Sequence, residues 1–151
     1  MAKKIISITC LILSFSCSNN IEVSSQKPPQ GVYEMRVYYT HDGKFEDIIS
    51  RFENHTTKLF EKHGFTNVGY WTTKKVDSVS FADKFIISNK SDSALVYIVS
   101  FKDMISRNES WSNFIKDPEW TNVFKESRLN GPIVKEIEQV FLSPTIFSGL
   151  K

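Results

Sequence analysis

Cysteine is nearly absent from this sequence, and the two that it has, Cys10 and Cys17, both lie close to the N-terminus. Residues 18–151 therefore offer no disulfide, no thiolate nucleophile and no cysteine-based metal site. Other signatures of dedicated chemistry are missing as well: there is no glycine-rich phosphate loop, no HExxH, no GxSxG and no set of carboxylates at metal-binding spacing. The sequence thus points to no cofactor and to no metal.

An excess of charge of one sign is also lacking, because 19 basic residues stand against 17 acidic ones. Two of the basic residues, Lys3 and Lys4, lie in a segment that we expect to be removed, which leaves the charges balanced. A neutral chain without a clustered basic stripe argues against nucleic acid as a partner, since neutralisation of phosphates dominates that kind of binding. The 40% apolar fraction and the 12 phenylalanines are enough for the core of one domain.

Long hydrophobic runs are limited to one short stretch, residues 5–15. It is shorter than the ~20 residues that span a bilayer, but it is typical of a signal peptide, with two lysines before it. It ends in Leu13-Ser14-Phe15-Ser16-Cys17, which resembles a bacterial lipobox, although Leu13 lies four rather than three residues before the cysteine. An ordinary secretory signal or an uncleaved anchor is the alternative.

Acylation of Cys17 would attach the protein to a membrane after removal of the signal, because two or three acyl chains anchor far more firmly than one. Residues 18–30 are polar and contain proline, which predicts a flexible tether to a domain at residues 31–151. We therefore expect an exported protein, lipid-anchored in the bacterial cell envelope, facing the periplasm or at the outer membrane.

The first half of the domain predicts a strand, a helix and a second strand. Residues 32–40 alternate between two faces, and so do residues 66–73. Between them, residues 44–63 carry apolar side chains at i, i+3, i+4 and i+7, and Gly64 ends the helix. The expected buried stripe of this helix consists of Phe45, Ile48, Ile49, Phe52, His55, Thr56, Leu59, Phe60 and His63.

The second half repeats this plan more loosely. Residues 94–101 are apolar on both faces and predict a central strand. Asp103 can cap a helix that breaks at Asp117-Pro118-Glu119, where a second cap restarts it, and residues 133–142 predict the last strand. The expected buried side chains of the two helical pieces are Trp111, Phe114 and Ile115, then Trp120, Val123 and Phe124. For residues 74–93 we expect an extended hairpin loop, with one helical turn or a short extra strand as alternatives.

This order predicts an α+β, ferredoxin-like βαββαβ fold, with a four-stranded antiparallel sheet and its helices on one face. The other face, on which we place Tyr38 and Trp71, needs a cover. We expect a second copy to supply it, as in a dimeric α+β barrel, because the strands at 66–73 and 94–101 are too apolar on both faces to be left in water. A monomer with this face exposed is the alternative.

Several segments in this order and spacing resemble the NIPSNAP family, a branch of the dimeric α+β barrel proteins. They are VYEMRVY at residues 32–38, FENHTTKLFEKHG at 52–64, NVGYW at 67–71, LVY at 95–97, Ser110-Trp111 with Phe114, DPEW at 117–120 and VFLSPT at 140–145. The loop at 74–93 is longer than is typical, and the lipobox replaces the organelle-targeting leader of eukaryotic relatives. The resemblance implies a homodimeric barrel, but neither a settled reaction nor catalytic residues.

Histidines are the first candidates for chemistry. His41 lies in a turn, where we expect it to be solvated. His55 and His63 are eight residues apart, so both are expected near the apolar side of the first helix, but an axial rise of ~12 Å keeps them from ligating one metal together. His55 would then be a proton acceptor or a haem-facing ligand in a pocket between helix and sheet. The alternative for each is a half-buried histidine with a hydrogen-bond partner.

Glu34 and Arg36 lie on one face of the first strand, which we expect to point toward the barrel interior of a dimer. An ion pair that bridges subunits or strands is the favoured interpretation, and an arginine that clamps a carboxylate or another anion is the functional one. The aromatic set Tyr38, Tyr70, Trp71, Trp111 and Trp120 is expected to be mostly core. If several of these side chains line one cavity, they would suit a planar apolar ligand.

Three hypotheses follow. The first is a lipid-anchored dimeric domain that binds a small apolar or aromatic molecule, or a partner protein, without dedicated catalysis. Its candidate ligand-binding residues are Arg36, Tyr38, His55, Tyr70, Trp71 and Trp111. The second is a cofactor-independent oxygenase or isomerase, or a haem-handling protein, with His55 or Tyr70 as the catalytic group. The third is a purely structural envelope protein.

Overall fold

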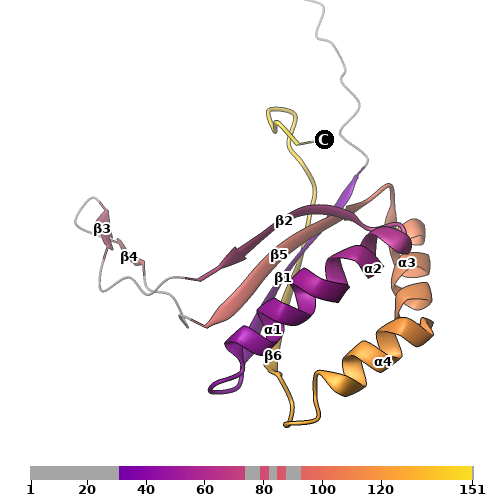
Figure 1. Ribbon diagram of the computed structural model, residues 1–151. Helices are drawn as coiled ribbons and strands as arrows, with labels where there is room; N and C mark the ends of the chain where they lie inside the picture. Colours follow the sequence, from indigo (N-terminus) through magenta and orange to yellow (C-terminus); the bar gives the residue numbers. More distant parts are fainter. Residues whose placement is uncertain (1–30, 74–78, 82–84, 88–92, 151) are drawn as a thin grey trace, which may run out of the picture.

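A computed structural model of the chain describes residues 31–73, 79–81, 85–87 and 93–150 (Figure 1). The predicted signal, lipobox and tether at residues 1–30 lie outside the described residues. The main elements are β1 (Val32–Thr40), α1 (Phe45–Arg51), the π-helical segment η1 (Phe52–Thr56), α2 (Thr57–Lys62), β2 (Thr66–Thr72), β5 (Ala94–Phe101), α3 (Met104–Lys116), α4 (Pro118–Glu126) and β6 (Val134–Leu142). None of the helices in the described part of the chain is long and apolar enough to cross a membrane.

The four long strands form one antiparallel sheet in the order β2-β5-β1-β6, and the helices lie together on one of its faces (Figure 1). This arrangement confirms the predicted ferredoxin-like α+β fold. Two further strands, β3 (Val79–Phe81) and β4 (Phe85–Ile87), pair with each other in a separate antiparallel sheet. They confirm the hairpin that was expected within residues 74–93.

The first helix runs without a break through α1, η1 and α2, and it ends at Gly64, whose φ of 80° favours glycine. A π-helical turn at its centre lets the Thr56 hydroxyl donate to the carbonyl oxygen of Arg51, five residues earlier. The wider turn keeps Arg51, Phe52 and Thr56 on the buried side. His55 is therefore rotated into solvent, and the expectation that it lies on the buried stripe is wrong.

Two aspartates cap the helices of the second half, as predicted. Asp103 accepts a hydrogen bond from the backbone N–H of Ser106 at 2.7 Å, and Asp117 accepts one from the backbone N–H of Glu119 at 2.8 Å. The Asp117-Pro118 break turns α4 away from the line of α3, so each piece buries a narrower side than predicted. Phe114 and Val123 are buried, whereas Ile115 is 60% exposed and Phe124 is 38% exposed, so the predicted burial of these two side chains is wrong.

Strand register decides which side chains face the helices. Glu34, Arg36 and Tyr38 of β1 lie opposite Val99, Tyr97 and Leu95 of β5, and all of these point toward the helices. Tyr38 packs edge-on against Phe52 of η1, with ring centroids 5.9 Å apart. The placement of Tyr38 on the uncovered face is thus wrong, and so is the expectation that Glu34 and Arg36 point into a dimer barrel, because the helices of the same chain cover this face.

The uncovered face carries the alternate residues. On the two central strands these are Tyr33, Met35, Val37 and Tyr39 of β1, and Val96 and Ile98 of β5. On β2, Trp71 is 51% exposed, as predicted for this face, and its indole lies over Gly69. A Cβ atom at Gly69 would come within 2.6 Å of the indole, so glycine makes room for the ring.

Candidate functional site

A cavity of about 520 Å³ lies between the sheet and the helices. Its wall comes from β1, α1, η1, α2, α3, α4 and β6 and from the segment that joins α4 to β6. The aromatic lining consists of Tyr38, Phe52, Phe60, Trp111, Phe114, Trp120 and Phe124, and the polar lining includes Arg51, Thr56, Arg128, Lys135 and Glu136. Such a chamber can hold a flat apolar molecule.

Arg51 brings a charge into this apolar setting from the last turn of α1. Its side chain is 6% exposed, and its guanidinium carbon lies 5.5 Å from the centre of the Trp120 ring. One nitrogen, Nη1, donates to the Ser127 hydroxyl at 3.3 Å, but the buried Nε has no hydrogen-bond partner. Burial lowers the pKa of Arg51, and the nearby positive charge of Arg128 lowers it further.

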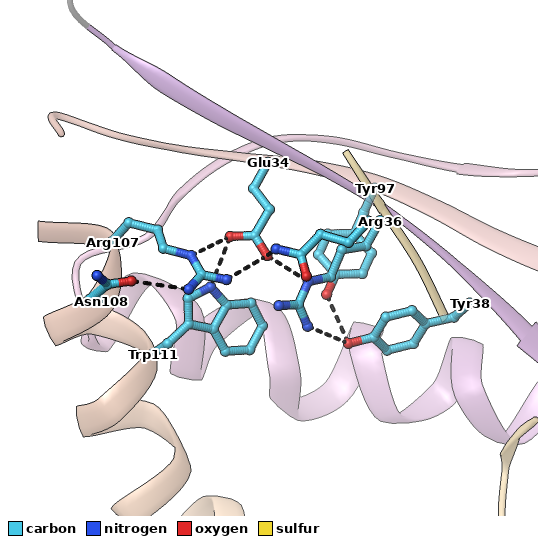
Figure 2. Close-up of polar contacts among 8 residues, drawn as sticks. Glu34, Arg36, Tyr38, Tyr97, Arg107, Asn108 and Trp111 are labelled. Atoms are coloured by element: carbon cyan, nitrogen blue, oxygen red, sulfur yellow. Dashed lines mark hydrogen bonds and ion pairs between the residues drawn. The ribbon is translucent and has the colours of Figure 1, made fainter. Parts of the chain in front are cut away.

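A second, fully satisfied polar cluster lies beside the cavity (Figure 2). Glu34 is completely buried, and its carboxylate accepts hydrogen bonds from Arg107 at 2.8 and 3.0 Å, from Arg36 at 2.6 Å and from the Trp111 indole at 3.0 Å. Gln139 of β6 donates a further bond at 2.9 Å. Burial by itself raises the pKa of Glu34, but the bond from Arg107 and the charge of Arg36 outweigh it and hold the pKa below its ordinary value.

Arg36 connects this cluster to the cavity wall. Its guanidinium stacks over the Trp111 ring at 3.9 Å and donates to the Tyr38 hydroxyl at 3.3 Å (Figure 2). The Tyr97 hydroxyl also donates to Tyr38, at 3.0 Å. The geometry thus supports the ion pair of Glu34 and Arg36, but both residues lie on β1, so this pair does not bridge subunits or strands as expected. Arg36 is not among the residues that line the cavity.

The predicted ligand-binding residues separate into three groups. Tyr38 and Trp111 line the main cavity. Tyr70 and Trp71 instead line a smaller apolar hollow of about 300 Å³ between β2 and the first helix. His55 is exposed and lines neither cavity. The enzyme hypothesis depended chiefly on His55, and it therefore loses its main catalytic candidate.

Tyr70, the other catalytic candidate, is a packed side chain. Its ring stacks on that of Tyr97 with centroids 5.8 Å apart, and its hydroxyl donates to the side-chain oxygen of Asn67. Burial raises the pKa of Tyr70, and the charge of Glu61 raises it further. The hydroxyl therefore stays protonated at neutral pH and is poorly suited to act as a base.

Sequence reasoning missed two arginines. Arg51 lies three residues after Ile48 and next to Phe52, so it occupies the apolar stripe of its helix. Arg107 lies one turn before Trp111, on the side of α3 that faces the sheet. A cation within an apolar stripe is the signal that could have found both. In the described part of the chain, no group of three or more His, Cys, Asp or Glu residues could hold a metal ion.

The fold and its cavity place this chain in the class of ferredoxin-like α+β domains. The family model of NIPSNAP matches residues 33–76 and 91–149, and the chain belongs to the NIPSNAP family. No curated protein matches the sequence.

Solved structures agree with this membership. A NIPSNAP family protein with unknown function from Agrobacterium tumefaciens str. C58 has a TM-score of 0.63 and 20% identity, with 82% of this chain and 96% of that chain covered. An uncharacterized NIPSNAP-like domain protein from Burkholderia xenovorans has a TM-score of 0.61 and 16% identity, with 80% and 90% covered. At these identities the likeness shows the fold alone.

Proposed function

We propose that this NIPSNAP domain binds a small, flat apolar or aromatic molecule in the cavity between its sheet and its helices. The observation that carries the proposal is the cavity itself, whose volume of about 520 Å³ falls within the range of roughly 300–1,000 Å³ that is common for small-molecule sites. Its aromatic side chains come from β1, η1, α2, α3 and α4, so they surround a ligand on several sides. Flat rings favour such walls because stacked and edge-on contacts add to the burial of apolar area.

Binding without dedicated catalysis agrees with the state of the titratable groups. Glu34, a buried carboxylate close to the cavity, already accepts hydrogen bonds from four side chains and is held deprotonated by two arginines. The lone pairs of Glu34 are thus engaged. If Glu34 took a proton, its ion pairs with the two arginines would be lost. The cavity is concave, as small-molecule sites are, whereas the contact surfaces between proteins are mostly flat. A small molecule is therefore the better candidate for its ligand than a partner protein.

Native mass spectrometry of the freshly isolated protein tests the proposal. We expect a retained small molecule that is lost from Trp120→Leu, because the Trp120 ring lines the cavity. The matched control is Trp71→Leu, since Trp71 lies outside this cavity. A gently isolated protein that carries no bound molecule, and takes up none from a set of flat apolar compounds, would contradict the proposal.

The protein is further proposed to act at the bacterial cell envelope as a lipid-anchored homodimer. The lipobox-like segment that ends in Cys17 supports the anchor, and the apolar uncovered sheet face supports the dimer. Cys17→Ala is expected to release the protein from membranes into the aqueous phase of a detergent partition. Unchanged partitioning into the detergent phase would count against acylation.

A further inference from the structure

The buried guanidinium of Arg51 lacks a counter-charge and most of its hydrogen bonds within the described part of the chain. A buried charge normally has a counter-charge and a full set of hydrogen bonds. Arg51 has one hydrogen bond, to Ser127, and no ion pair with a carboxylate among the described residues. Its guanidinium also lies near the rings of Trp120 and Phe124.

A guanidinium with unused donors is a natural partner for a carboxylate. Arg107 of the same protein shows this pairing in use: its Nε and Nη2 donate together to the two oxygens of Glu34, at 2.8 and 3.0 Å. In Arg51 the bond to Ser127 uses Nη1, and neither Nε nor Nη2 donates to a described residue. Arg51 therefore keeps unused donors in a cavity wall, although its Nε is closed off from water.

Other basic side chains strengthen the positive field at this place. Arg128 also lines the cavity, with its guanidinium carbon 4.7 Å from the centre of the Phe124 ring, and it is close enough to Arg51 to lower the pKa of that residue. Lys135 lines the cavity as well. Glu136 is the acidic residue among the described lining residues. Basic charge thus exceeds acidic charge around an otherwise apolar chamber.

We propose that the ligand of this cavity is an aromatic carboxylate, which pairs its charge with Arg51 and places its ring among Trp120, Phe124 and the other aromatic side chains. This inference rests on the proposed function, since it assigns a chemical class to the same ligand. A carboxylate accepts a charge-assisted hydrogen bond from the guanidinium of Arg51 and neutralises its charge. A singly charged carboxylate loses less hydration on entry into a mostly aromatic cavity than a doubly charged phosphate would. The carboxylate is therefore the better candidate.

Isothermal titration calorimetry on the purified full chain with 2-naphthoate and 2-naphthamide tests the proposal. The two probes share one ring system and differ in the charge of the head group. We expect 2-naphthoate to bind at least about tenfold more tightly than 2-naphthamide, as one charge-assisted hydrogen bond would provide. Added salt should weaken the binding of 2-naphthoate and leave that of 2-naphthamide nearly unchanged.

Arg51→Met removes the charge and keeps most of the side-chain volume, so it should lower the affinity for 2-naphthoate by about tenfold or more and leave the affinity for 2-naphthamide within a small factor. Lys58→Met, on the exposed side of the same helix, is the matched control and should change neither. Arg128→Gln removes an exposed cation from the cavity lining and should also weaken the binding of 2-naphthoate. It therefore tests the positive field of the cavity even if Arg51→Met does not fold.

The outcomes separate the two levels of the proposal. Equal binding of both probes, unaffected by Arg51→Met and Arg128→Gln, would overturn the assignment of a carboxylate and leave the binding cavity standing. Binding of neither probe would overturn the proposed binding function together with the assignment. A preference for 2-naphthoate that both arginine variants remove supports the assignment.

Discussion

At the scale of single residues, Glu34 organises one end of the molecule. Its carboxylate receives five hydrogen bonds, from β1 itself, from α3 and from β6. A carboxylate has about four lone-pair sites, so this one is saturated. Because α3 approaches the sheet through Arg107 and Trp111, Glu34 fixes the position of the helix that forms one wall of the cavity.

Replacement of this carboxylate is expected to destabilise the fold strongly. Glu34→Gln leaves Arg36 and Arg107 without their buried counter-charge, which typically costs about 3 kcal/mol or more of unfolding free energy. Urea unfolding followed by circular dichroism measures this loss. Glu109→Gln, on the exposed side of α3, is the control and should change stability by less than about 0.5 kcal/mol. A Glu34→Gln protein as stable as this control would show that the cluster contributes little.

At the scale of elements, Asp117 connects two helices. It caps α4 through the backbone N–H of Glu119, and its other oxygen binds Lys62 at 2.8 Å and His63 at 2.6 Å, at the end of α2. Hydrogen bonds from Lys62, then from His63 and from the backbone, hold the pKa of Asp117 well below its ordinary value. The predicted cap is confirmed, and it also joins the two helices at one corner of the molecule.

This junction should make stability depend on acid. Because the folded-state pKa of Asp117 is depressed, its stabilisation is complete above the unfolded value of about 3.9 and is lost as the pH falls toward the folded value. Asp117→Asn is expected to be less stable than the wild type at pH 7, and to lose less further stability between pH 5 and pH 2. Urea unfolding across this range gives the comparison, with Asp42→Asn in the exposed turn as the control. Parallel pH profiles for wild type and Asp117→Asn would contradict the prediction.

At the scale of the whole molecule, one face of the sheet is covered by helices and the other is not (Figure 1). The uncovered face presents Met35, Val37, Val96 and Ile98 on its two central strands. Glu136 and Glu138 of β6 lie beside these strands on the same face. An apolar surface with a polar rim commonly marks a site of association. The proposed homodimer would bury it against the same face of a second copy.

A charge at the centre of this face should prevent the association. The protein without residues 1–17 is expected to elute as a dimer in size exclusion with light scattering. Ile98→Lys is expected to elute as a monomer, because a lysine in the interface would be buried without a partner. Ile105→Lys, at a position of α3 that is 72% exposed, serves as the control and should remain dimeric. A wild-type monomer at micromolar concentration would refute the dimer.

Local sequence patterns were sufficient to predict the helices and strands of this protein. The strand alternation, the first helix to Gly64, the caps at Asp103 and Asp117 and the apolar strand β5 all depend on residues that are close in sequence, and the structure confirms them. The order of these elements, with the quoted NIPSNAP-like segments, was enough for the fold class and the family.

Only the tertiary structure decided the site. Helical spacing placed His55 on the buried stripe, but a π turn rotated it into solvent, and such a turn depends on how the helix packs. Alternation could separate the two faces of β1 but could not say which face the helices cover, so Glu34, Arg36 and Tyr38 were assigned to the wrong side. The meeting of Arg51 with Trp120 and Arg128 joins residues from different helices, and no local pattern encodes contacts between segments so distant in the chain.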